Sequence, residues 1–455
     1  MYIRSKRVFI DNKLRPATIE ILSEKITKIS SYSSAPKDEL LDLNDLIVLP
    51  AAIDGHVHMR EPEASNKEDF FSGSMAALKG GVSAFIDMPC YNSPPTTTVG
   101  ALAEKEKLAS KKSFCDFGFH FGATETNSEL IKKLKPPSIK AFLAETHSPL
   151  TLSENGLEKL FLAAYPAYPI LVHCEDKDII EKNKKIYKEH HKIRSIQAAI
   201  EAVKKVNKLA TKYKRRVHFC HLSTSKEIKY AKLNNKNLPK GFEEVLYKKL
   251  ISCEVATHHL FLSTKDIEKL GLKANVNPPL RPPNEVNKLW KMLSKVDCIV
   301  SDHAPHTLEE KEKGACGFIG VQTLLPLMLD AVLQKRISLN LAVNLLTIKP
   351  AQVFNIYSKG KIAAGYDADF VVFDPNASWT IKESDLASKT KWSPYLGRTL
   401  KGKIIGTIIR GTLAYWEDKI LIKPGYGKPL QRIKTTQNSI PLFLKKHSKE
   451  VYGFF

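Results

Sequence analysis

The chain has 455 residues, of which 43% are hydrophobic and 26% are charged, and its formal net charge is +22. This length exceeds that of one ordinary domain, and the composition is typical of a folded globular protein. No apolar run approaches the roughly 20 residues that a membrane helix needs, and the first residues lack the apolar stretch of a signal peptide. Seven cysteines without CxxC spacing argue against a disulfide framework and predict a reducing, cytoplasmic setting.

The positive charge has two interpretations: a nucleic-acid surface, or lysines on solvated helix faces. Lysines gather in helical-looking stretches such as 182–188 and 204–208, without the regular interleaving of aromatic side chains on which bases stack. We therefore expect no nucleic-acid partner and no membrane association. A basic surface would, however, attract an anionic small-molecule substrate.

The first 50 residues are predicted to form short strands. Residues 7–10 and 17–21 are strand-like and are separated by the turn-like 11–13, and a third apolar run covers 46–50. We interpret 1–50 as the first part of a small β-domain.

Between residues 51 and 355, short apolar runs alternate with longer helical stretches, which include 70–79 and 196–213. The runs cover 83–87, 138–142, 170–173, 216–221, 251–255 and 298–302. This alternation predicts an α/β fold with a parallel sheet, and the number of units favours a (β/α)8 TIM barrel over 51–355.

Strand-like segments return after the predicted barrel. A turn at 365–369 leads into 370–374, and 404–411 follows. We expect 356–422 to complete a small β-sandwich domain with 1–50. The basic tail, 423–455, is expected to pack loosely.

The strongest chemical signal is the pair His56 and His58, which follows the apolar run 47–53. Strand periodicity points both rings to one side, about 7 Å apart along the strand. Two imidazoles placed in this way can bind one cation or two neighbouring cations.

Three further candidate ligands also end apolar runs. His173 ends the run 170–173, His221 ends the run 216–221, and Asp302 ends the run 298–302. In a barrel these ends meet at one mouth, where chemistry takes place. A carboxylate at the Asp302 position can both bind a metal and accept a proton from an attacking water.

Lys140 is the remaining candidate. A lysine at the mouth of a barrel is costly unless its charge is removed or paired. Reaction with CO₂ would convert it into a carbamate that bridges two metals, and a salt bridge to Glu145 or to the substrate is the alternative. The residues alone do not decide between the carbamate and the salt bridge.

Strand periodicity also sorts the neighbours of these candidates. Cys174, Cys220 and His218 are predicted to face the helical layer as packing residues. We expect His190 and His191 to be solvated and His120 to lie in the core. His258 and His259 could either pack in the interior or orient metal ligands, and the sequence does not decide between these roles.

The assembled residues resemble those of the cyclic amidohydrolases, most closely the dihydroorotases, over essentially the whole chain. The matching segments are HVHMREP at 56–62, IKAFLAET at 139–146, VHFCHLST at 217–224, CEVATHHL at 253–260, VNPPLR at 276–281 and DHAPHT at 302–307. The last of these is the most specific to dihydroorotases.

The resemblance implies a binuclear zinc centre bridged by carboxylated Lys140. His56, His58 and Asp302 would hold one Zn²⁺, and His173 and His221 the other. It also implies reversible hydrolysis of dihydroorotate to N-carbamoyl-L-aspartate in pyrimidine biosynthesis, by a hydroxide that bridges the metals. In that reaction Asp302 would move the proton.

The same resemblance assigns substrate-binding residues. Arg60, Asn277 and His306 would hold the substrate carboxylate and ring, because the planar fork of an arginine pairs well with a carboxylate. The alternative for Arg60 is a surface salt bridge to Glu61 or Glu63. Thr146 resembles a lid threonine, although a plain loop hydroxyl would look the same.

One segment departs from the family pattern. Dihydroorotases usually carry MPNTxPP, whereas this chain has MPCYNSPPT at 88–96, so that Cys90 replaces the substrate-binding asparagine and Asn92 lies two residues later. The segment resembles that of allantoinases, which open a neutral ring. Allantoinases, however, as a rule lack an arginine at the Arg60 position and a histidine at the His306 position. We therefore expect a dihydroorotase in which Asn92 binds substrate, with an allantoinase or hydantoinase as the alternative.

A second alternative is a catalytically inactive scaffold of the same fold. In such a protein other residues would stand at the metal-ligand positions, whereas all six candidate ligands are present here. The resemblance further implies a homodimer and a possible association with aspartate transcarbamoylase.

Overall fold

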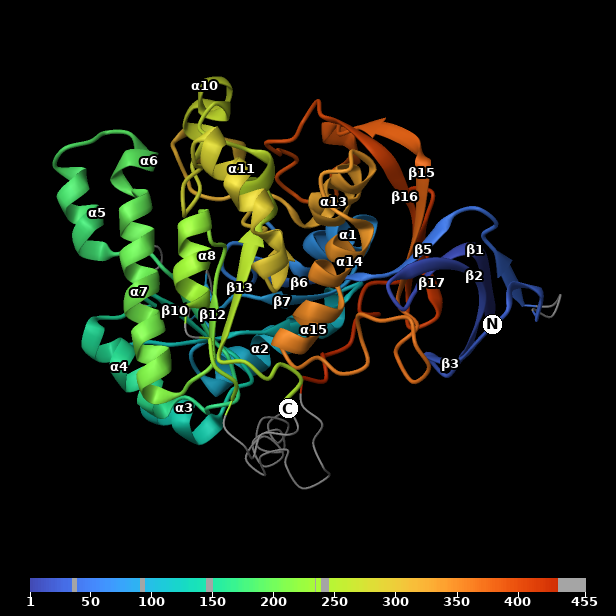
Figure 1. Ribbon diagram of the computed structural model, residues 1–455, viewed down its shortest axis with the longest axis horizontal. Helices are drawn as coiled ribbons and strands as arrows, with labels where there is room; N and C mark the ends of the chain where they lie inside the picture. Colours follow the sequence, from blue (N-terminus) through green and yellow to red (C-terminus); the bar gives the residue numbers. More distant parts are fainter. Residues whose placement is uncertain (35–38, 91–94, 145–149, 234, 239–244, 433–455) are drawn as a thin grey trace.

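The structure is a computed structural model that describes residues 1–34, 39–90, 95–144, 150–233, 235–238 and 245–432. Within this part of the chain, parallel strands lie among helices in the centre, and a mixed sheet lies at one end of the molecule (Figure 1). None of the described helices is long and apolar enough to cross a membrane.

The parallel strands form two sheets, ordered β6-β7-β8 and β14-β13-β12-β11-β10-β9. Their bounds are β6 Ala52–Val57, β7 Val82–Asp87, β8 Asp116–Phe119, β9 Phe121–Gly122, β10 Ile139–Phe142, β11 Ile170–His173, β12 Val217–Phe219, β13 Ile251–Ala256 and β14 Cys298–Val300. Only His120 separates β8 from β9, and Val57 at the end of β6 forms a parallel bridge with His303 just after β14. The predicted α/β fold with parallel sheets is therefore confirmed, and its closure into a barrel stays a prediction.

Helices follow most of these strands. Their bounds are α1 Phe70–Lys79, α2 Val99–Lys112, α3 Ser128–Leu134, α4 Glu154–Ala163, α5 Lys177–Lys184, α6 His190–Ile193, α7 Ile196–Tyr213, α8 Ser225–Lys232, α9 Thr257–Phe261, α10 Asp266–Leu270, α11 Pro283–Lys291, α12 Leu308–Glu312, α13 Leu324–Leu333, α14 Leu339–Leu346 and α15 Ile348–Val353. The predicted helices 70–79 and 196–213 match α1 and α7. Both begin after a capping side chain, Asp69 and Ser195, which accepts a hydrogen bond from the first helical turn.

Alternation along the parallel strands divides two hydrophobic layers. On β11, Leu171 packs in an inner cluster with Ile53 and Val300, whereas Ile170 and Val172 pack in a larger cluster with the helices. Strands buried on both faces in this way read as nearly continuous apolar runs, and for this reason the sequence revealed most of them.

Two differences from the sequence expectations concern strand limits. The run 47–53 is not one strand: β5, Ile47–Pro50, pairs with the mixed sheet, whereas β6 pairs with β7. The strand pair β8 and β9 was not predicted, because its residues, DFGFHFG at 116–122, contain glycine and polar residues in place of a β-branched run.

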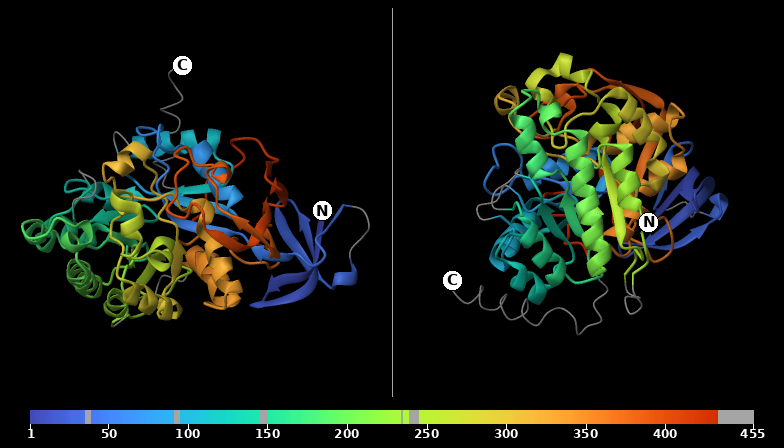
Figure 2. Two further views of the ribbon diagram at one scale, coloured as in Figure 1. Left: turned by 90° about the horizontal axis from the view of Figure 1, so that it is seen from above. Right: turned by 60° about the vertical axis from the view of Figure 1, so that its left-hand side comes forward.

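The mixed sheet has the order β18-β17-β16-β15-β5-β1-β2-β3, with β4 beside β1. Its other bounds are β1 Tyr2–Ile10, β2 Lys13–Leu22, β3 Lys25–Ser30, β4 Leu40–Asp42, β15 Phe370–Thr380, β16 Thr399–Ile409, β17 Thr412–Trp416 and β18 Lys419–Ile420. Because β15 pairs antiparallel with β5, strands from both halves of the chain share this sheet, as expected (Figures 1 and 2). Asp11 and Asn12, with φ of 49° and 66°, form the tight turn between β1 and β2.

The segment after residue 422 is not loose where the structure describes it. Leu430 N donates to Phe117 O on β8, and the buried Arg432 donates to Phe119 O and to Ser138 Oγ. The end of this described part is therefore anchored, because Arg432 donates to buried oxygen atoms next to β8 and β10. Loose packing of the tail as a whole stays a prediction. Residues 433–455 lie outside the described residues.

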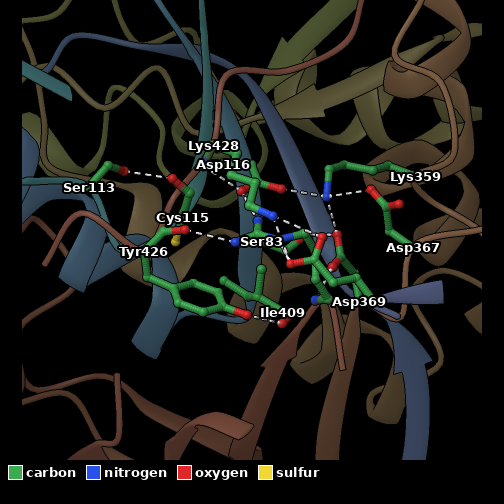
Figure 3. A network of polar contacts seen from close by, with 12 residues as sticks. Ser83, Ser113, Cys115, Asp116, Lys359, Asp367, Asp369, Ile409, Tyr426 and Lys428 are labelled. Atoms are coloured by element: carbon green, nitrogen blue, oxygen red, sulfur yellow. Dashed lines mark hydrogen bonds and ion pairs between the residues drawn. The ribbon is translucent and has the colours of Figure 1, made fainter. Parts of the chain in front are cut away.

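A buried ion cluster joins the mixed sheet to the parallel strands (Figure 3). Lys359 Nζ lies 2.7 Å from Asp116 Oδ2 on β8, 2.7 Å from Asp369 Oδ2 and 3.0 Å from Asp367 Oδ2. Arg410 forms a second ion pair with Asp116. The three carboxylates are close enough to hold a metal ion, but the ammonium group of Lys359 already occupies that position.

Candidate metal centre and active site

The first group of candidate ligands gathers at the carboxyl end of β6. His56 Nε2 lies 3.3 Å and His58 Nε2 3.4 Å from the same oxygen, Asp302 Oδ1, and all three side chains are buried. The backbone N–H of His58 donates to His303 O over 2.7 Å, which ties β6 to the segment after β14. The predicted trio is therefore brought together by the structure.

Glu254, on β13, contacts His56 through the ring nitrogen that does not face Asp302. Its Oε1 lies 2.5 Å from His56 Nδ1, its Oε2 lies 2.8 Å from His218 Nε2, and Oε1 also accepts the backbone N–H of His221. Burial would raise the pKa of Glu254, but the two imidazoles hold it well below its usual range. The carboxylate therefore turns His56 so that Nε2 faces Asp302, as carboxylates that support metal-binding histidines do.

His173 and His221 form the second group. His173 Nδ1 lies 3.1 Å from His221 Nε2, and His173 Nε2 lies 2.8 Å from Glu175 Oε2, which also pairs with Arg194. Burial raises the pKa of Glu175, but Arg194 and His173 bring it down to about 2, so that it is an anion at neutral pH. The ring of His221 lies 5.1 Å from that of His56, so the two groups adjoin.

Lys140, on β10, is fully buried beside both groups. Its Nζ donates to Cys220 Sγ over 3.1 Å and lies 4.8 Å from the centre of the Phe142 ring. Among the described residues Lys140 forms no ion pair, and Glu145, the alternative partner, lies outside them. A charge on a fully buried amine is costly without an ion pair, so the predicted carbamate remains compatible with this environment.

The donor set suits a divalent metal. Burial lowers the pKa of His56 to about 4 and the pKa values of His173 and His221 below their usual value, so the rings are neutral and able to bind a cation. Four imidazoles and a carboxylate are ligands that Zn²⁺ prefers. The residues present therefore fit a metal centre.

A cavity of about 340 Å³ opens over this centre. Its lining residues include all six predicted ligands, three predicted substrate residues and a short loop: His56, His58, Lys140, His173, His221, Asp302, Arg60, Asn277, His306 and 314–317. Asn92 and Thr146, also predicted to bind substrate, lie outside the described residues.

Arg60 and His306 are neighbours on one wall. Arg60 Nε donates to Pro305 O over 3.0 Å, and its Nη2 lies 3.2 Å from His306 Nε2. The alternative partner Glu61 instead pairs with Lys112. The guanidinium is therefore held inside the cavity, as the substrate-binding interpretation requires.

Three expectations about neighbouring residues were wrong. Cys220 and His218 point inward, toward Lys140 and Glu254, because His221 adopts φ of 30° and the chain turns there, which brings consecutive side chains into the same space. His190 is not simply solvated, since its Nε2 lies 2.9 Å from Asn277 Oδ1. Cys174, by contrast, packs with the helical layer as predicted.

Other histidines lie in the interior. His120 is fully buried and contacts Ser138 Oγ and Gly55 O, as expected for a core residue. His258 and His259 are buried, and His259 Nε2 donates to Pro278 O next to Asn277. Sequence reasoning missed Glu254 and Glu175, although a carboxylate within or just after a buried strand is a signal that could have identified both.

Comparisons with known proteins show the family to which the chain belongs. The sequence pattern of the amidohydrolase family matches residues 47–414. A dihydroorotase of Methanosarcina acetivorans is 36% identical over an alignment of 459 positions, gaps included, that covers 95% of each chain. A dihydroorotase of Pyrococcus furiosus is 36% identical over an alignment of 435 positions that covers 95% of this chain and 97% of the relative.

Among solved structures, L-hydantoinase (dihydropyrimidinase) from Arthrobacter aurescens superimposes with a TM-score of 0.87 at 26% identity. The match covers 94% of this chain and 100% of that one. The chain therefore belongs to the amidohydrolase family and, within it, to the dihydroorotases.

Proposed function

We propose that this protein is a dihydroorotase that interconverts dihydroorotate and N-carbamoyl-L-aspartate in pyrimidine biosynthesis. The observation that carries the proposal is the position of Arg60 and His306, which line the same cavity as the four histidines and Asp302. A cyclic amide with a carboxylate substituent matches both parts of this cavity. The 36% identity to curated dihydroorotases supports the same substrate.

His56, His58 and Asp302 would hold one divalent cation, and His173 and His221 the other, with Lys140 as a carbamate between them. Bound there, two Zn²⁺ ions would supply Lewis-acid activation of water and of the amide carbonyl. The burial of Lys140 without an ion pair among the described residues supports the carbamate. In the presence of ¹³C-bicarbonate, the wild type should show a carbamate carbon signal that Lys140→Arg lacks.

The residues of the chain supply the remaining chemistry. Water attacks the ring carbonyl, the amide C–N bond breaks, and the proton lost by the water passes through Asp302 to the leaving nitrogen. Arg60 pairs bidentately with the substrate carboxylate. Asn277 and His306 complete the contacts within the described part of the chain, and Asn92 and Thr146 remain predicted contacts.

We infer the finer architecture as well: a (β/α)8 TIM barrel over 51–355, with a small β-sandwich from 1–50 and 356–422 and a tail over 423–455. The alignment of the parallel strands from β6 to β14 and the likeness to L-hydantoinase support it. A cytoplasmic location, a homodimer and an association with aspartate transcarbamoylase remain predictions. Size-exclusion chromatography with and without that enzyme tests the homodimer and the association.

Hydantoinase or allantoinase activity is the second candidate, favoured by the likeness to L-hydantoinase and by the inward packing of Cys90. An inactive scaffold is disfavoured, because the structure gathers all six candidate ligands. Assays of the zinc-loaded protein on dihydroorotate, allantoin and hydantoin separate these candidates. Turnover of allantoin without turnover of dihydroorotate would replace the proposed substrate.

A further inference from the structure

Asn277 lies on the wall of the active-site cavity, and one of its two amide atoms faces away from that cavity. Its Oδ1 lies 2.9 Å from Nε2 of His190, the first residue of α6. Within the described part of the chain, its Nδ2 makes no hydrogen bond. The direction in which this amide points decides whether the cavity wall offers a donor or an acceptor.

The surroundings of His190 determine that direction. Its Nε2 also lies 3.2 Å from Val276 O, a backbone carbonyl that can only accept. Nε2 must therefore carry a proton, and the side-chain atom of Asn277 that meets it must be the oxygen. The more distant Sγ of Cys316, 3.7 Å away, does not displace these contacts.

The helix that carries His190 is itself held at several points. Arg194, which follows α6 directly, pairs with Glu175, and Glu175 in turn holds the candidate ligand His173. Arg281 Nη1 donates to Arg194 O over 2.7 Å. One short segment thus contacts both the support of a metal ligand and a residue of the substrate wall.

We propose that His190 is a positioning residue that holds the Asn277 amide with its oxygen toward α6 and its nitrogen toward the cavity. The amide nitrogen then donates to a carbonyl or carboxylate oxygen of the substrate without first having to be oriented. The identity of that substrate rests on the proposed function. The orientation of Asn277 does not.

Four variants test this in the zinc-loaded enzyme: His190→Phe, His190→Gln, Asn277→Ala and the double variant His190→Phe/Asn277→Ala. Loss of one orienting hydrogen bond should raise KM for dihydroorotate about fivefold in His190→Phe, with kcat within about twofold of wild type. His190→Gln keeps an N–H donor and should restore most of the affinity. His191→Phe, on the same helix, is the matched control and should leave KM unchanged.

The double variant separates positioning from simple loss of structure. If His190 acts through Asn277, its removal adds nothing once Asn277 is gone, so the double variant should have the KM of Asn277→Ala. Additive effects, or an unchanged KM in His190→Phe, would overturn the proposal. Zinc content and the thermal unfolding midpoint of each variant show whether it is folded.

If His190→Phe does not fold, Asn277→Asp provides an independent test with α6 intact. One carboxylate oxygen should accept from His190 and the other should face the cavity, where it repels an anionic substrate and raises KM above that of Asn277→Ala. Equal KM values would contradict the proposal. If the wild type turns over a different cyclic amide, the proposed function fails, and the same cycle is measured on the amide that is hydrolysed.

Discussion

At Arg60 the backbone adopts φ of 63°, and the guanidinium is held between Pro305 O and His306. Replacement by methionine keeps the bulk of the side chain but removes the charge. Losing one partner of a buried charged pair should cost about 3 kcal/mol, which is about 100-fold in KM for dihydroorotate. Steady-state kinetics with zinc analysis should show this loss with metal content intact.

Arg60→Lys is the matched control, because it has the same backbone strain as Arg60→Met but retains the charge. Lysine lacks the planar fork, so an intermediate KM is expected. A KM for Arg60→Met equal to that of wild type would remove Arg60 from the substrate site.

Glu254 offers a second test among single residues. In Glu254→Gln the amide nitrogen competes with the N–H groups of His56 and His218, so the ligand His56 loses its orientation. Loss of such a supporting carboxylate should weaken metal affinity about 10- to 100-fold. Competition with a zinc chelator measures this directly.

Glu285→Gln serves as the comparison, since Glu285 pairs with Lys288 on α11, away from the centre. It should bind zinc as the wild type does. Equal zinc affinity in both variants would mean that Glu254 does not orient His56.

Among the structural elements, the junction between β8 and the mixed sheet depends on Lys359. Lys359→Met leaves three neighbouring carboxylates, one on β8 and two before β15, without their central cation. Breaking a buried ion network in this way should lower the free energy of unfolding by about 3–5 kcal/mol. Urea denaturation measures the change, and the exposed Lys361→Met should change it little.

The same cluster predicts a pH dependence. Burial raises the pKa of Asp116, but Lys359 and Arg410 hold it below its usual value in the folded state. Its contribution to stability is therefore complete above the unfolded pKa of about 4 and is lost as the pH falls through the folded pKa. The stability difference between wild type and Lys359→Met should shrink on acidification below about pH 4, and a constant difference would argue against this cluster.

The elements also show how far sequence reasoning reaches. Runs such as 170–173 coincide with strands because strands that are buried on both faces are continuously apolar. The orientation of His218 and Cys220 could not be predicted, because the positive φ of His221 ends the period of two on which the expectation was based. The contact between His190 on α6 and Asn277 could not be predicted either. The lysine-rich sequence around His190 is typical of a solvated helix, and the two residues meet only in the folded structure.

For the whole molecule, the proposed metal centre would join candidate ligands from β10, β11, the end of β6 and the segments after β12 and β14. Metal bound only by the folded state should stabilise it, by about 4 kcal/mol at a free concentration a thousandfold above Kd. Chelation should therefore lower the thermal unfolding midpoint, and zinc should restore it. In His56→Ala the effect should be much smaller, whereas an equal response would place the stabilising metal elsewhere.

The six candidate ligands and Arg60 could be proposed from the sequence because most of them lie in or just after predicted strands, and all but His173 lie within a recognisable motif. The supporting carboxylates Glu175 and Glu254 were missed. Their buried positions could have marked them as candidates, but the rings that Glu254 contacts, His56 and His218, lie on other strands and are known only from the fold. The same holds for the cluster at Lys359, which joins residues from β8 and the second half of the chain.

The most direct test is a parallel assay of the zinc-loaded protein on dihydroorotate, allantoin and hydantoin, with N-carbamoyl-aspartate followed as product. We expect ring opening of dihydroorotate, the reverse cyclisation of N-carbamoyl-aspartate, and little turnover of the two neutral rings. Turnover of a neutral ring without any turnover of dihydroorotate would contradict the assignment of Arg60 and of the whole cavity to a substrate that carries a carboxylate.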